Sequence, residues 1–351
     1  MTMDYYDWDR TFSYDAPITV VLTARGFGKT YGFRKHAIRE YLRKGYRTAE
    51  IVRTKDELND FGPSYFLKVG EDKDLEGYTF KSTKRRGYIA PTPENENARP
   101  KWGEFAYFVS LSEAQVKKKI GYPSITRVMF DEFLIDRSID RIHDYLHNEY
   151  EMVSKLFDTL TRERPGDVKK PHLYLCANAV DLANPYFRAW GIDDEPPRGY
   201  SWWADKTVLL HYPEAGEYGE RKATETVAGR MGGGLDSSAF NTFDTGDASF
   251  FCERPRGARY LVGVVYRGDR YAIWDCPRDG FYYVDGDVKT DDQHITYALT
   301  TEDNRVNYYY ARRINKTMKG IVELYSYGAL RYRDFATKKG FEKALSLFGV
   351  R

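Results

Sequence analysis

The stretch Ile18-Thr19-Val20-Val21-Leu22-Thr23-Ala24-Arg25-Gly26-Phe27-Gly28-Lys29-Thr30 decides the fold of the first half of this chain. Its first residues are apolar and β-branched and follow Pro17, which predicts a strand buried on both faces. Its last residues are those of a phosphate-binding loop. Small residues let backbone N–H groups surround an anion, the lysine reaches the β and γ phosphates, and the threonine hydroxyl ligates Mg²⁺. The stretch therefore predicts nucleotide binding, against the alternative of a turn with an incidental lysine.

The residues after the loop have the pattern of a helix. Apolar side chains recur at helical spacing over residues 31–44, and Gly45 stands where a carboxyl-terminal cap belongs. The strand, loop and helix of a phosphate-binding loop thus follow one another. Thr23 departs from the full pattern, which begins with glycine at this place. The expected nucleotide-binding residues of the loop are Thr23, Ala24, Arg25, Gly26, Phe27, Gly28, Lys29 and Thr30.

The composition indicates a globular protein of more than one domain. The chain has 351 residues, 42% of them hydrophobic and 30% charged, which suffices for two domains. A formal net charge of +2 neither requires nor excludes a nucleic-acid partner. The scattered Cys176, Cys252 and Cys276 have no zinc or disulfide spacing, so a reducing cytosol fits best. No apolar run reaches the length that would span a bilayer, and the first residues do not resemble a secretory signal.

A second nucleotide motif occurs about a hundred residues after the loop. Residues 125–133 form a mostly apolar run that contains the adjacent carboxylates Asp131 and Glu132. Asp131 is expected to hold Mg²⁺, through water or together with Thr30. Glu132 is expected to accept a proton from the attacking water. The pair therefore indicates hydrolysis of ATP rather than binding only.

One single lysine and one run of three lysines are candidates for binding a ligand or DNA. Lys55 follows a predicted strand at residues 48–52, and the ends of parallel strands are where ligands bind in open α/β sheets. A solvated helix start explains Lys55 equally well. Lys117-Lys118-Lys119 could contact DNA, although such charge runs are usually solvated faces.

Two further polar residues follow predicted elements beyond the second nucleotide motif. Residues 145–160 are expected to form an amphipathic helix, and Arg162 at its end is a candidate finger into a neighbouring subunit. The alternative is a charge that complements the helix dipole. Asn178 ends a predicted strand at residues 172–177 and could sense the γ-phosphate, unless it merely tolerates a turn.

The order of these motifs is typical of one family. The phosphate loop at residues 23–30, Tyr122-Pro123 before the 128–133 strand, Asp158-Thr159 before Arg162, and residues 178–187 occur in that order. The chain resembles the DNA packaging ATPases of phi29-like tailed phages, compact relatives of the large terminases. The resemblance implies a ring motor, typically of five subunits, that docks on the portal vertex of a procapsid in the host cytoplasm. It implies that ATP drives double-stranded DNA inward, and it leaves a packaging RNA open as a partner.

The resemblance also assigns roles to residues. Arg162 matches the trans-acting arginine finger, and Lys55 matches a basic residue that acts across the subunit interface. Lys117, Lys118 and Lys119 lie where related motors face the DNA in the pore. The remaining matches are Lys29 and Thr30 in the phosphate loop, Arg25 as the arginine inside it, Asp131 as the Mg²⁺ aspartate and Glu132 as the catalytic glutamate.

The second half of the chain predicts another domain. A hairpin is expected at residues 260–275, further strands follow, and residues 302–347 read as mostly helical. Strands followed by helices suggest a ribonuclease H-like domain. Its first long strand carries no acidic residue, and Asp275, Asp285 and Asp287 stand at strand ends or turns. Because a nuclease needs clustered metal ligands, we expect a vestigial domain with a basic surface that includes Arg254, Arg256, Arg259, Arg267 and Arg270.

The expected architecture is therefore α/β throughout. Residues 1–205 are expected to form a P-loop ATPase domain of the ASCE, RecA-like class, with a mostly parallel sheet and helices on both faces. Residues 206–235 are expected to form a linker domain, and residues 236–351 the ribonuclease H-like domain. Two other functions compete with the packaging motor: a large terminase with an active nuclease, and a P-loop kinase or nucleotide-binding regulator unrelated to DNA.

Overall fold

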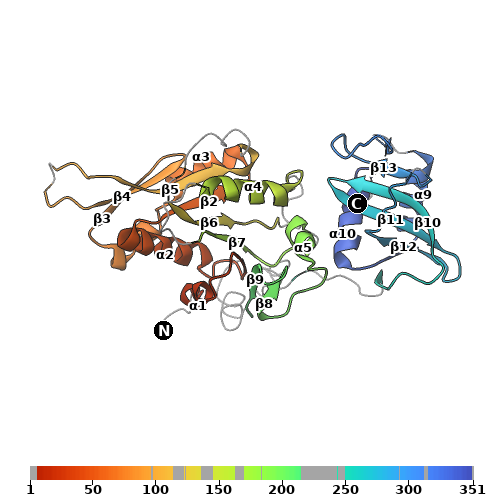
Figure 1. Cartoon of the computed structure of the whole chain (residues 1–351), viewed down its shortest axis with the longest axis horizontal. Coiled ribbons are helices and arrows are strands. Elements are labelled where there is room, and N and C mark those ends of the chain that lie inside the picture. Colours follow the sequence, from red (N-terminus) through yellow and green to blue (C-terminus); the bar gives the residue numbers. More distant parts are fainter. Residues whose placement is uncertain are drawn as a thin grey trace, which may run out of the picture. The chain divides into compact units, whose positions relative to one another are not determined.

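The computed structural model describes residues 6–95, 98–113, 122, 124–135, 145–162, 170–182, 184–214, 243, 250–291, 293–311 and 315–349. The predicted DNA contacts Lys117, Lys118 and Lys119 lie outside these residues. The chain divides into two compact units, shown in Figure 1. The first unit comprises residues 1–144, 149–180 and 196–242. The second unit comprises residues 145–148, 181–195 and 243–351.

In the described part of the first unit, nine strands form one sheet in the order β3-β4-β5-β2-β6-β7-β1-β9-β8. The six strands from β5 to β9 in this order run parallel, whereas β3, β4 and β8 are antiparallel additions at the edges. One strand, β7, separates β1 from β6, which confirms the expected mostly parallel ASCE sheet. The strands are β1 Ile18–Leu22, β2 Arg47–Val52, β3 Tyr78–Ser82, β4 Arg86–Pro91, β5 Gly103–Ser110, β6 Ile125–Asp131, β7 His172–Ala177, β8 Gly199–Trp203 and β9 Val208–Tyr212.

Helices cover both faces of this sheet, as Figure 1 shows: α3 and α4 lie on one face and α1 and α2 on the other. The central strands are buried on both faces, β7 along its whole length, because helices exclude water from each side. Gly45 ends α2 in a left-handed conformation with φ of 73°, as the sequence predicted. The helices of this unit are α1 Trp8–Ser13, α2 Lys29–Lys44, α3 Lys55–Ser64 and α4 Glu149–Thr161, with short turns η1 Val69–Glu71, η2 Lys73–Leu75 and η3 Leu111–Glu113.

Two expected boundaries differ from the structure. The helix expected over residues 145–160 begins at Glu149, because Asn148 has a φ of 54°, which a helix cannot contain. The first unit also extends beyond residue 205, since β9 pairs in parallel with β1 and belongs to its sheet. Residues 215–235 of the expected linker domain lie outside the described residues.

In the second unit, six described strands form a sheet in the order β14-β13-β10-β11-β12-β15. β10, β11 and β12 are a connected antiparallel set, and β13 and β14 run parallel to β10, which is the expected ribonuclease H-like arrangement. The short strands β14 and β15 interrupt the region that was expected to be mostly helical. The elements are α5 Pro185–Trp190, β10 Arg259–Tyr266, β11 Asp269–Cys276, β12 Phe281–Asp285, β13 Thr296–Ala298, β14 Tyr309–Tyr310, α9 Lys316–Ser326, β15 Leu330–Tyr332 and α10 Phe335–Ser346.

The core of the second unit lies between its sheet and its helices. Val264 and Ile273 of the sheet are fully buried against Met318 of α9 and Phe341 of α10. Among the helices that the structure describes, none is both long and apolar enough to cross a membrane.

Candidate active site

The phosphate loop lies at the carboxyl edge of the first sheet, between β1 and α2. Gly26 and Gly28 have φ values of 89° and 81°, a region that residues with a side chain rarely adopt. Gly28 is also the N-cap of α2, and glycine has no side chain with which to bond the first N–H groups of the helix. These N–H groups, together with the positive end of the helix dipole, form an anion site.

Lys29 and Asn178 meet at this loop. The Lys29 side chain is buried, and its Nζ donates a hydrogen bond of 3.0 Å to Oδ1 of Asn178. Asn178 follows β7, which pairs with β1 up to Leu22 and Ala177. The pairing of neighbouring parallel strands thus carries the amide to the phosphate loop. Asn178 therefore lies beside Lys29 of the phosphate loop, and its role at the nucleotide stays a prediction.

Thr30 and Asp131 form the second contact of the site. Thr30 Oγ1 donates a hydrogen bond to Oδ2 of Asp131, the last residue of β6. A hydroxyl and a carboxylate oxygen are hard ligands of the kind that Mg²⁺ prefers, together with several waters. The residues therefore fit the metal that the sequence analysis placed here.

Glu132 has a strained backbone. Its φ of 55° lies in the left-handed region, which costs a residue with a side chain on the order of 1–3 kcal/mol and is frequent at functional sites. Its N–H donates to Oδ1 of Asp131 at 3.0 Å, and the N–H of Phe133 donates to the carbonyl of Cys176 at 3.3 Å. The side chain itself is exposed, as a group that must reach a water molecule should be.

Arg53, the residue after β2, holds this strained turn. Its guanidinium donates to the carbonyl oxygens of Glu132 (3.3 Å) and Phe133 (2.8 Å). It also forms a two-pronged ion pair with Glu149, the first residue of α4, at 3.0 and 3.2 Å. The Glu149 side chain is 0% exposed. The sequence patterns pointed to Lys55 in this segment rather than to Arg53, although an arginine directly after a buried strand was an available signal.

We expect replacement of Arg53 with methionine to destabilise the protein by about 3 kcal/mol or more, because it removes the guanidinium that pairs with the buried Glu149 carboxylate. The measurement is the free energy of unfolding in urea. The double variant Arg53→Met with Glu149→Leu should recover most of the loss. Lys155→Met, which breaks the exposed Lys155–Glu151 pair, is the control and should change stability by less than about 1 kcal/mol. If Arg53→Met and Lys155→Met lowered the free energy of unfolding equally, the Arg53–Glu149 pair would not have the stabilising role expected here.

The other two predicted catalytic residues, Arg162 and Lys55, are both exposed. Arg162 follows the last residue of α4, and its contact with Asp158 is a loose one of 3.9 Å. Because α4 has 13 residues, its two ends are separated by about 20 Å. Its first residue, Glu149, is the one joined through Arg53 to Glu132. Arg162 is therefore far from the Glu132 of its own subunit. Lys55 is the first residue of α3 and its side chain is exposed.

Two curated relatives are similar to this chain over most of its length. The DNA packaging protein of Bacillus phage B103 is 26% identical over 294 residues, which are 83% of this chain and 84% of the relative. The DNA packaging protein of Bacillus phage phi29 is 26% identical over 308 residues, 86% of this chain and 85% of the relative.

Solved structures share the fold over nearly the whole length. A chain of the bacteriophage phi29 viral genome packaging motor assembly has a TM-score of 0.69 at 22% identity, with 98% of this chain and 99% of that chain covered. A chain of the Phi-28 gp11 DNA packaging motor has a TM-score of 0.61 at 16% identity, with 100% and 99% covered. The model of the family described as Podovirus DNA encapsidation protein (Gp16) matches residues 2–343. The chain belongs to this family of podovirus DNA encapsidation proteins.

Proposed function

We propose that this protein is the ATP-hydrolysing subunit of a ring motor that moves double-stranded viral DNA into a procapsid. The observation that carries the proposal is the contact of Thr30 with Asp131, with the strained Glu132 next to it, in a member of the DNA encapsidation family. The solved relatives with the same fold are packaging motors. The motor acts in the host cytoplasm and at the portal vertex of the procapsid.

The described residues suit the hydrolysis of ATP. The N–H groups of the loop receive the phosphates, and Lys29 places its charge at the β and γ phosphates. Thr30 and Asp131 hold Mg²⁺, which when bound neutralises the charge of the phosphate oxygens. Glu132 takes a proton from the attacking water. Asn178 is proposed to detect the γ-phosphate through Lys29, because the three N–H donors of the ammonium can bind Asn178 Oδ1 and a phosphate oxygen together.

The site is completed by a neighbouring subunit. Arg162 lies at the far end of α4 from its own Glu132, so it can stabilise the transition state only in another copy. Lys55 is proposed to act across the same interface. On the resemblance to phi29-like motors, we propose a ring of five subunits in which Lys117, Lys118 and Lys119 contact the DNA, and a packaging RNA is a candidate partner.

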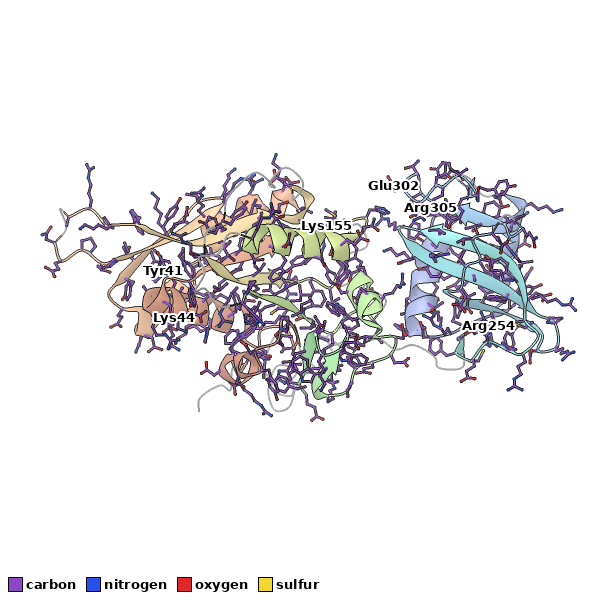
Figure 2. All side chains as sticks on the ribbon, viewed as in Figure 1. Tyr41, Lys44, Lys155, Arg254, Glu302 and Arg305 are labelled. Atoms are coloured by element: carbon purple, nitrogen blue, oxygen red, sulfur yellow. The ribbon has the colours of Figure 1, made fainter. Side chains whose placement is uncertain are left out.

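We further propose that the second unit does not cleave DNA. Both carboxylate oxygens of the buried Asp285 are taken: Oδ1 accepts from Nε1 of Trp274 (2.9 Å) and Oδ2 from Arg254 (2.7 Å). Arg254, labelled in Figure 2, also pairs with Asp287 at 2.9 Å. These acids therefore hold an arginine, which a metal ion would have to displace. Plasmid cutting in Mn²⁺ would refute this view and favour a complete terminase.

The rate of ATP hydrolysis with and without procapsids and double-stranded DNA tests the proposed function. We expect the rate to rise several-fold when both are present, because the ring assembles on the portal and the subunits then share their sites. A Lys29→Ala chain is the control for contaminating hydrolysis. An unchanged rate, with turnover independent of protein concentration, would favour a kinase or a nucleotide-binding regulator instead.

A further inference from the structure

The segment Tyr6–Ser13 packs behind the phosphate loop and binds its backbone. The N–H of Tyr6 donates to the carbonyl oxygen of Phe27 at 3.1 Å, and Nε1 of Trp8 donates to the carbonyl oxygen of Lys29 at 2.8 Å. Gly28 lies between these two carbonyl groups. The segment thus holds the loop from its carbonyl side.

The indole of Trp8 is fixed in place by other rings. It is 4% exposed. Phe12 stacks on it with ring centroids 5.0 Å apart, while Phe33 of α2 and Tyr174 of β7 meet it edge-on at 5.5 and 5.8 Å. An indole N–H is a donor only, so a buried one needs an acceptor. Lys29 supplies that acceptor, and the aromatic neighbours keep the ring from turning away.

The indole of Trp8 approaches α2 so closely at Gly32 that there is no room for a side chain. A Cβ built on Gly32 would lie 2.6 Å from Cδ1 and 3.0 Å from Nε1 of Trp8, and real Cβ atoms essentially never come nearer than 3.0 Å to another atom. Gly32 is inside α2, where alanine is the better helix former. The close approach of the indole to the first turn of the helix therefore explains why residue 32 is glycine rather than alanine.

The start of the segment is anchored independently. The Tyr6 hydroxyl is 2.8 Å from both Oγ1 of Thr11 and Nδ1 of His211 in β9. Tyr200 stacks on His211 with centroids 3.7 Å apart. Burial lowers the pKa of His211 to about 4, and Arg10 adds to the effect, so the ring is neutral at pH 7. The segment is therefore attached to the sheet as well as to the loop.

We propose that Trp8 is a positioning residue of the nucleotide site. Its bond to the Lys29 carbonyl fixes the first turn of α2, so that the N–H groups of the turn face the triphosphate. Because Gly28 offers no side-chain cap, these groups are available to phosphate oxygens, and the rigidity of the loop comes from its carbonyl side. This inference rests on the nucleotide binding proposed above.

Replacing Trp8 with 3-benzothienylalanine tests the bond, because this residue keeps the shape of the indole and has sulfur in place of the N–H. We expect the Kd of a fluorescent ATP analogue with Mg²⁺, and the KM for ATP, to rise about fivefold, the usual net effect of one hydrogen bond. The kcat at saturating ATP should stay the same. The same replacement at the exposed Trp202 is the matched control and should change neither value.

A second pair of variants tests the same idea through Gly32. Gly32→Ala should also raise the Kd, because the added Cβ displaces the indole. In a Trp8→Phe background, Gly32→Ala should raise the Kd by a smaller factor, because the smaller ring leaves room for the Cβ. If the effects of the two substitutions on the Kd were fully additive, the inference would be overturned. It is also overturned if the Trp8 analogue lowers the thermal midpoint but binds nucleotide as the unsubstituted protein does. If the unsubstituted protein binds no nucleotide, the proposed function itself is wrong.

Discussion

Replacing Glu132 with glutamine should stop ATP hydrolysis while ATP is still bound. Glutamine keeps the size and the backbone contacts of the residue but cannot accept a proton from water. A general base contributes on the order of 10²- to 10⁴-fold to a rate, so kcat should fall by about that factor. The loop of Gly28 to Thr30, which we propose holds the phosphates, is unaltered. The measurements are phosphate release for kcat and equilibrium titration for the Kd of ATP.

The control for this variant is Glu151→Gln on α4. Glu151 is an exposed glutamate whose partner is Lys155, labelled in Figure 2, at 3.1 Å. Its loss should leave both kcat and Kd as they are. Hydrolysis by Glu132→Gln at nearly the control rate would place the base elsewhere. If the Kd rose together with the loss of kcat, the substitution would have altered the strained turn and not only the ability of residue 132 to accept a proton.

The parts of the site that the sequence predicted are those with a local signal. The phosphate loop follows a buried strand directly, and Asp131 ends another, so residue type and position along the strand were enough. Because the carboxyl ends of parallel strands meet at one edge, the contacts of Lys29 with Asn178 and of Thr30 with Asp131 follow from strand order.

The parts that the sequence did not predict depend on contacts between distant residues. Arg53 and Glu149 are 96 positions apart, and neither is unusual within its own segment. Only the folded structure shows that Arg53 bonds the carbonyl of Glu132 and pairs with Glu149 at the start of α4. Trp8 looked like part of a polar and aromatic start to the chain, and its role depends on where α1 meets α2. The strands β14 and β15 have two and three residues, too few for an alternating pattern.

The pairing of Arg53 with Glu149 also explains how the backbone of Glu132 is kept in its strained conformation. A left-handed turn at a residue with a side chain persists when its surroundings determine it more strongly than its own preference. Arg53 bonds two successive carbonyls of the turn, and burial of Glu149 keeps the guanidinium in place. The backbone at Glu132, the proposed general base, is thus held by the residue after β2 and by α4 as well as by β6.

Arg162→Ala should reduce ATP hydrolysis in assembled rings as strongly as the loss of Glu132. An arginine finger stabilises the charge that develops in phosphoryl transfer and contributes on the order of 10³- to 10⁵-fold. Arg162 is exposed and its pair with Asp158 is loose, so its removal should leave the fold and the Kd of ATP unchanged. Lys155→Ala, which removes a cation from the same helix, is the control and should retain its activity.

Mixing two inactive variants decides whether the site is shared. A Lys29→Ala subunit cannot hydrolyse ATP but still presents Arg162, whereas an Arg162→Ala subunit keeps its own nucleotide site. In a ring with head-to-tail interfaces, equal mixing should give about one quarter of interfaces with both parts intact. Activity should therefore return on mixing, in proportion to that fraction. A mixture that co-assembles on procapsids yet stays inactive would show that Arg162 does not act across the interface, and the far end of α4 would then need another role.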